Sequence, residues 1–161
     1  MDKAGICSLI LRLYTQVPGN IIPDTEEFAP ECRGLRLYDA PLVGFGSADD
    51  PLFETFHDPA VIGPWHRTPR QWLPEANTVI SMFFPIAESI RRLNAAQKDH
   101  ACLQWAYARV DGQNFMQALT RALAEQLQSQ GLLTCIPILS PGYGSYHAGQ
   151  SASLPEYDCL N

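Results

Sequence analysis

Residues 69–85, PRQWLPEANTVISMFFP, contain the run on which the predicted fold depends. Thr68 and Gln71 form the pattern of a capping box, which predicts a short helical turn at the start of this stretch. The run 78–84 that follows is apolar on both faces and ends at Pro85. Such a run is typical of a strand buried on both sides, in a sheet that helices cover. We interpret it as the central strand.

Patterns typical of helices occur in the sequence well before and well after this strand. Residues 3–17 repeat apolar side chains at the spacing of one helix face. A longer stripe runs from Trp105 to Gln126, and Gly131 is placed to end that helix in the left-handed conformation. Gly112 lies in the stripe, where glycine costs about 1 kcal/mol relative to alanine. The sequence therefore predicts a close approach at Gly112, by the backbone of the sheet.

Residues 132–139, LLTCIPIL, read as a further strand. Because Pro137 cannot donate to a ladder, this strand is expected to be an edge, or to be paired on one side only near its end. A strand, a long helix and a strand predict a right-handed crossover with parallel pairing. The expected fold class is α/β, with α+β as the alternative. We expect a small mixed or parallel sheet of about three or more strands, covered by an N-terminal helix and one long crossover helix. Residues 1–140 are predicted to form a single domain, and residues 141–161 an irregular tail or a linker to an absent domain.

Composition narrows the class of protein. The 161 residues suit one domain with a sizeable core. A formal net charge of −6 argues against nucleic acid or an anionic membrane as the partner. We expect no membrane span, because no stretch approaches the length of apolar sequence that a span needs. Arg12 interrupts the N-terminal apolar run, which lacks the pattern of a secretory signal. The expected location is the cytoplasm.

The cysteines are five in number and widely separated, with no C-x-x-C pair. They predict neither a disulfide framework nor a zinc or iron–sulfur site built from this chain alone, so we expect no cofactor in it. Free and mostly buried thiols are the simplest interpretation. A nucleophilic Cys–His pair is the alternative, and Cys102 is the thiol whose position suits it.

A basic group lies on both sides of the central strand and forms the candidate ligand-binding set: His66, Arg67, Arg70, Arg91 and Arg92. A strand of this length spans roughly 23 Å, so the residues before it and those after it are expected at opposite ends rather than in one patch. Each end is a candidate anion site, and solvated surface charge is the alternative. No metal site and no catalytic residue can be assigned.

Three segments together resemble a known family. GLRLYDAPLVGFGSADDPLF (34–53), PRQWLPEANTVISMFFPIAESIRRLN (69–94) and WAYARVDGQNFMQAL (105–119) are similar to the amino-terminal region of iron–sulfur proteins related to epoxyqueuosine reductase. In that family such a region precedes a segment that helps to form a corrinoid- or substrate-binding domain. A ferredoxin-like domain with [4Fe–4S] clusters follows it. The resemblance thus implies [4Fe–4S] and cobalamin as candidate cofactors of the whole protein.

The cluster-binding cysteine runs of the family have no counterpart among these 161 residues. The resemblance therefore implies a non-catalytic amino-terminal domain of an iron–sulfur reductase, as a fragment or a truncated relative. Its expected partner is the absent C-terminal ferredoxin-like domain or another subunit. Two alternatives stay open: an interaction module that self-associates, as a homodimer, and a small thiol enzyme.

Overall fold

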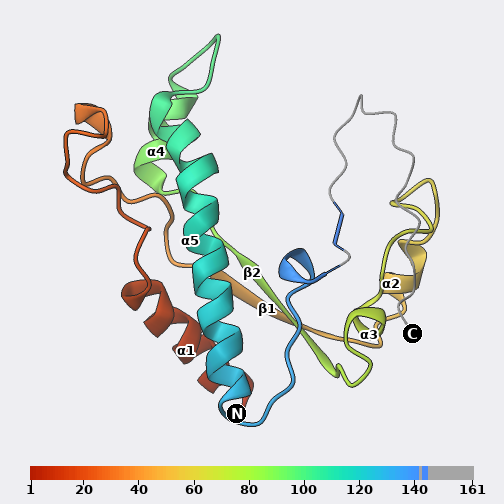
Figure 1. Cartoon of the computed structure of the whole chain (residues 1–161). Helices are drawn as coiled ribbons and strands as arrows, with labels where there is room; N and C mark the ends of the chain where they lie inside the picture. Colours follow the sequence, from red (N-terminus) through yellow and green to blue (C-terminus); the bar gives the residue numbers. More distant parts are fainter. Residues whose placement is uncertain (142, 145–161) are drawn as a thin grey trace.

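The computed structural model describes residues 1–141, 143 and 144. Helices and a small sheet make up this part of the chain (Figure 1). In chain order the elements are α1 (Lys3–Gln16), η1 (Pro30–Cys32), β1 (Leu42–Ser47), α2 (Leu52–Thr55), α3 (Pro69–Trp72), β2 (Thr78–Phe83), α4 (Glu88–Ala95), α5 (Leu103–Gln128) and η2 (Pro137–Leu139). The predicted tail, residues 141–161, lies almost wholly outside the described residues.

Strands β1 and β2 form an antiparallel ribbon. The register runs from Leu42 opposite Phe83 to Ser47 opposite Thr78. Among the described residues the sheet contains these two strands alone. The expected mixture of helices and strands is confirmed, while the mixed or parallel sheet of about three or more strands is wrong for the part of the chain that the structure describes. The strand at 78–83 pairs with a strand that precedes it, and not with the segment that follows the long helix.

The segment predicted as a third strand has another conformation. Residues 132–136 lie outside any strand, and residues 137–139 form the short 3-10 helix η2. Leu139 donates its N–H to the carbonyl of Ile136 at 3.0 Å, which closes this turn. Pro137 fixes its own backbone angle and brings no donor, so the chain turns here instead of continuing along a ladder.

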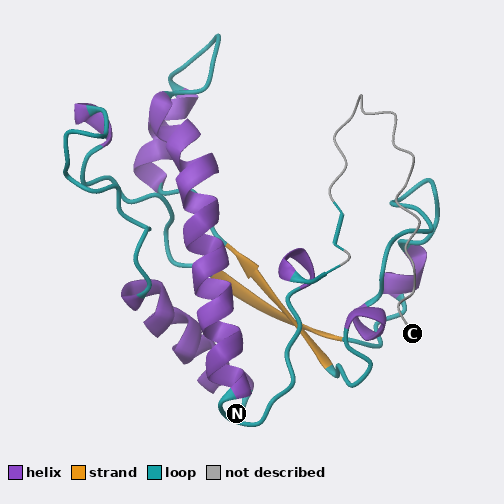
Figure 2. Ribbon diagram, viewed as in Figure 1, coloured by secondary structure: helices purple, strands orange, loops and turns teal. Residues whose placement is uncertain are grey.

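The helices cover one face of the ribbon. Val43, Ile80 and Met82 point to the same face and pack against the core of α1, α4 and α5. Figure 2 shows these three helices gathered together, with the ribbon extending away from them. On the opposite face, Leu42 and Phe83 are 64% and 62% exposed. The prediction that β2 is buried on both sides is therefore wrong within the described chain, because no helix lies on its second face.

The long helix follows its prediction closely. Its buried stripe includes Ala108, Gly112, Phe115 and Leu119. Gly131 has a φ of 80° and ends the helix in the left-handed region, as predicted. The close approach at Gly112 also exists, but its partner differs from the prediction. The ring of Tyr38, rather than the backbone of the sheet, occupies the space that a Cβ at Gly112 would need.

The connection between α1 and β1 is held by a polar contact at its centre. The side chain of Asn20 accepts from the backbone N–H of Tyr38 at 2.9 Å and donates to its carbonyl at 3.1 Å. Tyr14 donates from its hydroxyl to the same carbonyl at 2.9 Å. These bonds satisfy buried groups of an irregular segment and fix Tyr38 beside α5.

Candidate functional site

An excursion of residues 48–77 joins the two strands and carries most of the candidate site residues. Its local structure follows from its turn chemistry. Asp50 accepts from the N–H of Leu52 at 3.0 Å at the start of α2. The side chain of Gln71 reaches back to the N–H of Thr68 at 2.7 Å, as the predicted capping box requires. The excursion is thus a set of short capped turns at the far end of the ribbon (Figure 1).

A pocket of about 170 Å³ opens in this excursion, and acidic side chains are prominent in its wall. Asp49, Asp50 and Glu54 line it together with the guanidinium of Arg70. Arg70 binds both carboxylate oxygens of Asp49, and its second amino group donates to the carbonyl of Pro74 at 2.8 Å. The hydrogen bonds from Arg70 hold the pKa of Asp49 below its ordinary value. The predicted basic residue is therefore already paired within the pocket wall.

Two histidines lie beside this pocket. The ring nitrogen Nε2 of His57 is 2.9 Å from the carbonyl oxygen of His66, and its Nδ1 is 3.2 Å from a carboxylate oxygen of Glu54. The Nε2 atom of His66 is buried and has no hydrogen-bond partner in the described structure. Burial, assisted by the nearby His57, lowers the pKa of His66, although Glu54 acts in the opposite direction. The neutral ring is therefore the favoured form of His66.

The remaining basic candidates fall into two separate places. Arg67 lies over the ring of Trp72 at 4.9 Å. Beyond the other end of β2, Arg91 donates to the carbonyl of Ile86 at 2.9 Å, and Arg92 pairs with Glu88 at 2.5 Å. Figure 1 shows α3, which carries Arg70, and α4, which carries Arg91 and Arg92, beyond opposite ends of β2, as expected. Anion binding at either end remains a prediction.

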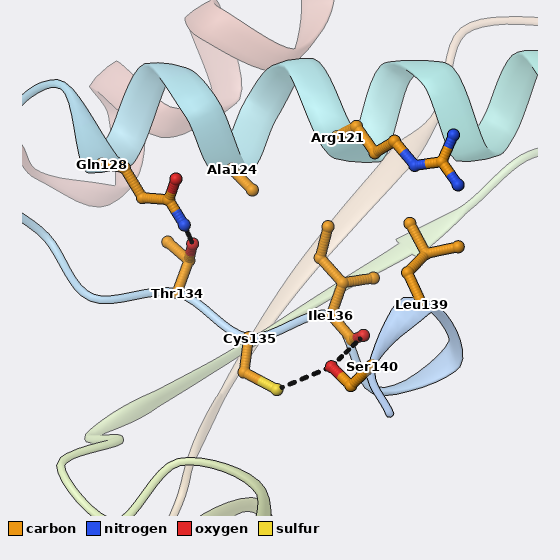
Figure 3. Close-up of a pocket in the computed structure, with 8 residues that line it drawn as sticks. All are labelled: Arg121, Ala124, Gln128, Thr134, Cys135, Ile136, Leu139 and Ser140. Atoms are coloured by element: carbon orange, nitrogen blue, oxygen red, sulfur yellow. Dashed lines mark hydrogen bonds between the residues drawn. The ribbon is translucent and has the colours of Figure 1, made fainter. Parts of the chain in front are cut away.

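A second pocket of about 240 Å³ lies between α5 and the segment that follows it (Figure 3). Gln128 donates to the hydroxyl of Thr134 at 2.8 Å, and the thiol of Cys135 is 3.3 Å from the hydroxyl of Ser140. Arg121 lines the same pocket. The sequence interpretation missed this site because it assigned the segment to a sheet rather than to the side of α5.

The thiols have a simple arrangement. Cys102 is the N-cap residue of α5, is buried, and donates its backbone N–H to the side-chain oxygen of Asn94 at 3.0 Å. The ring of His100 contacts the carbonyl of Ala101 at 3.2 Å.

Within residues 1–141, 143 and 144, no group of three or more potential ligands of the His, Cys, Asp and Glu types could hold a metal ion. Nor is any helix of this part long and apolar enough to span a membrane.

Comparisons with known proteins add no relative: no family model matches the chain, and neither the curated proteins nor the solved structures contain a match.

Proposed function

We propose that this chain is a non-catalytic amino-terminal domain of a cytoplasmic iron–sulfur reductase related to epoxyqueuosine reductase. In this proposal the domain acts by packing against a ferredoxin-like unit that carries the [4Fe–4S] clusters. A corrinoid would be bound by the whole protein rather than by this domain alone.

One aromatic cluster supports the proposal, because it joins the three segments on which the resemblance depends. The rings of Tyr38 and Phe84 are 6.1 Å apart, and those of Phe84 and Phe115 are 6.3 Å apart. Each of these residues comes from a different segment of the three. Edge-on aromatic pairs of this kind add to the stability that burial provides. The three segments therefore pack as one unit, as parts of a single ancestral domain would.

The second face of the ribbon is the surface on which we place the cluster-bearing unit. Strand β2 is apolar on both faces, a pattern typical of strands covered on both sides. Its open face pairs Leu42 with Phe83, and neither β1 nor β2 contains a charged residue. A Cβ at Gly44 or Gly46 would meet nothing within 4 Å in the described structure. An apolar cover on this face would complete the sheet.

The test is binding in trans. The chain would be titrated with the reconstituted ferredoxin-like domain of an epoxyqueuosine reductase, and the affinity measured by calorimetry. We expect a complex that weakens about tenfold or more when Leu42 and Phe83 are replaced by Ser, because an exposed apolar anchor is lost. Val110, which is 67% exposed on α5, provides the matched control, and Val110→Ser should leave the affinity unchanged.

Two outcomes would contradict this proposal. One is the absence of any complex with the cluster-bearing domain. The other is an intrinsic [4Fe–4S] cluster or reductase activity in the chain as purified.

Self-association is the second candidate, and the segment after α5 favours it. Within the described residues, the backbone N–H groups of residues 133–136 donate to no other backbone group. Unpaired backbone of this kind is a template for another strand. Light scattering over a range of concentrations separates the candidates, because a strictly monomeric chain excludes the homodimer and leaves the first proposal standing.

A further inference from the structure

The pocket between α5 and the segment that follows it has two walls of different character (Figure 3). One wall is a face of α5, where Arg121, Ala124 and Gln128 lie on the same side because they are three and four residues apart. The other wall includes the half-buried side chains of Ile136 and Leu139. The volume of about 240 Å³ is smaller than that of pockets for drug-sized ligands, which occupy about 300–1,000 Å³. The pocket therefore suits a small ligand.

Hydrogen bonds hold the second wall against the helix. The hydroxyl of Ser140 donates to the carbonyl of Ile136 at 2.8 Å. A hydroxyl has a single proton to donate, so the thiol of Cys135 is the donor in its contact of 3.3 Å with the Ser140 oxygen. At the other end of the pocket, Gln128 donates to the hydroxyl of Thr134 at 2.8 Å. These polar groups satisfy one another, and none of their bonds uses the guanidinium of Arg121.

Arg121 gives the pocket its charge. No other residue of the lining is acidic or basic. Arg70 and Arg92 each pair with a carboxylate, whereas the guanidinium of Arg121 has no hydrogen bond or ion pair within the part of the chain that the structure describes. Its planar set of N–H donors matches the two oxygens of a carboxylate. Figure 3 shows this guanidinium extending beside the side chain of Leu139, so the cation and the apolar wall adjoin.

We propose that this pocket binds a short aliphatic monocarboxylate. The carboxylate pairs with Arg121, and the chain lies along Ala124 against Ile136 and Leu139. An inorganic anion would leave the apolar wall without a contact, and a neutral aliphatic molecule would leave the guanidinium without a counter-charge. This inference goes beyond the proposed function and does not depend on it, since the pocket contains no residue of the ribbon.

The experiment titrates the isotope-labelled full chain with sodium pentanoate at low ionic strength and follows the backbone amides by NMR. We expect saturable shifts within residues 121–140 and a Kd of about 1 mM, because one exposed ion pair and a few buried methylenes contribute modestly. Pentanamide has the same shape without the charge, and acetate has the charge without the chain. Each should bind at least about tenfold more weakly than pentanoate.

Matched arginine variants test the assignment of the cation. Arg121→Gln should weaken pentanoate binding about tenfold and remove the preference over pentanamide. Arg121→Lys should retain part of the affinity, because lysine keeps the charge but lacks the planar fork. Arg109→Gln is the control, since Arg109 is also exposed on α5 but does not line the pocket, and it should leave binding unchanged. Circular dichroism checks that each variant keeps the helix content of the parent chain.

Four results would overturn the inference. These are shifts that do not saturate or that map outside residues 121–140, pentanamide binding as tightly as pentanoate, phosphate binding as tightly as pentanoate, and unchanged affinity in Arg121→Gln. The wild-type chain alone supplies the first three. None of these results bears on whether the cluster-bearing unit binds to the open face of the ribbon, so the two proposals fail independently.

Discussion

Tyr38 lies across Gly112, with its hydroxyl donating to the carbonyl of Ala108 at 2.8 Å, one turn earlier in α5. This contact joins the segment before the ribbon to the middle of the longest helix. It also explains a glycine in the buried stripe of a helix, where alanine would otherwise be favoured by about 1 kcal/mol.

Gly112→Ala should destabilise the protein despite its better helix propensity. A Cβ at this position would overlap the Tyr38 ring, which is held by its hydroxyl and by Phe84. We expect a net loss of about 1–3 kcal/mol in the free energy of unfolding, measured in urea. Gly44→Ala is the matched control, since its Cβ would meet no atom within 4 Å, and it should be neutral or slightly stabilising. A variant Gly112→Ala as stable as the parent would contradict this account of the contact.

Tyr38→Phe should cost about 1 kcal/mol through the lost hydrogen bond to Ala108. It should also alter the alkaline limb of the stability curve. Burial raises the pKa of Tyr38, although Arg109 acts against this. The stability linked to the neutral phenol is thus complete below about pH 10 and is lost as the pH rises through the higher folded-state pKa. Urea titrations from pH 8 to 11 should show a shallower decline for the variant, and parallel curves would be evidence against a buried phenol.

The lowered pKa of His66 predicts acid sensitivity near neutrality. The unfolded chain takes up a proton at its ordinary pKa of 6.5, whereas the folded chain resists protonation because burial and the nearby His57 disfavour the cation. The stability linked to neutral His66 is therefore complete above pH 6.5 and declines as the pH falls through the folded-state pKa. His66→Phe should flatten this part of the curve, while His100→Gln, at an exposed position, should not. An unchanged slope in the His66→Phe chain would disprove the assignment.

Arg70→Gln should release the carboxylate of Asp49. Because the hydrogen bonds from Arg70 are the largest cause of the lowered Asp49 pKa, that pKa should return toward its ordinary value of 3.8 in the variant. A carbon-detected NMR titration of the side-chain carboxylates measures this directly. Asp58, which accepts from the N–H of Ala60 and from no arginine among the described residues, serves as the internal reference. If Asp49 titrates at the same pH in both chains, the ion pair does not form in solution.

The parts of the fold that are determined by residues close together in the sequence were predictable. The stripe of α5, its end at Gly131 and the bond between Gln71 and Thr68 all follow from local periodicity and cap chemistry. The pairing of β1 with β2 was not predictable, because β1 lies thirty-odd residues upstream of β2. No feature near β2 in the sequence favours β1 over a partner later in the chain. Residues 132–136 share the composition of a strand, yet Pro137 turns them away from any ladder.

The candidate site was predictable only as a list of charges. The sequence placed the basic residues toward two ends of β2, which the structure bears out, but it could not pair Arg70 with Asp49 across the excursion. Arg121 and Cys135 were missed altogether, because a pocket between a helix and an irregular segment leaves no periodic signal.

The ribbon of β1 and β2 connects the helical core to the excursion of residues 48–77. Ala48 and Asn77 close its far end with a hydrogen bond of 3.1 Å, and the bonds among Asp49, Arg70 and Pro74 remain within the excursion beyond that point. Replacement of residues 49–76 by a short turn should therefore leave the core of α1, α4 and α5 intact. Residues 48–77 thus form a local unit of their own, separate from the core that α1, α4 and α5 share.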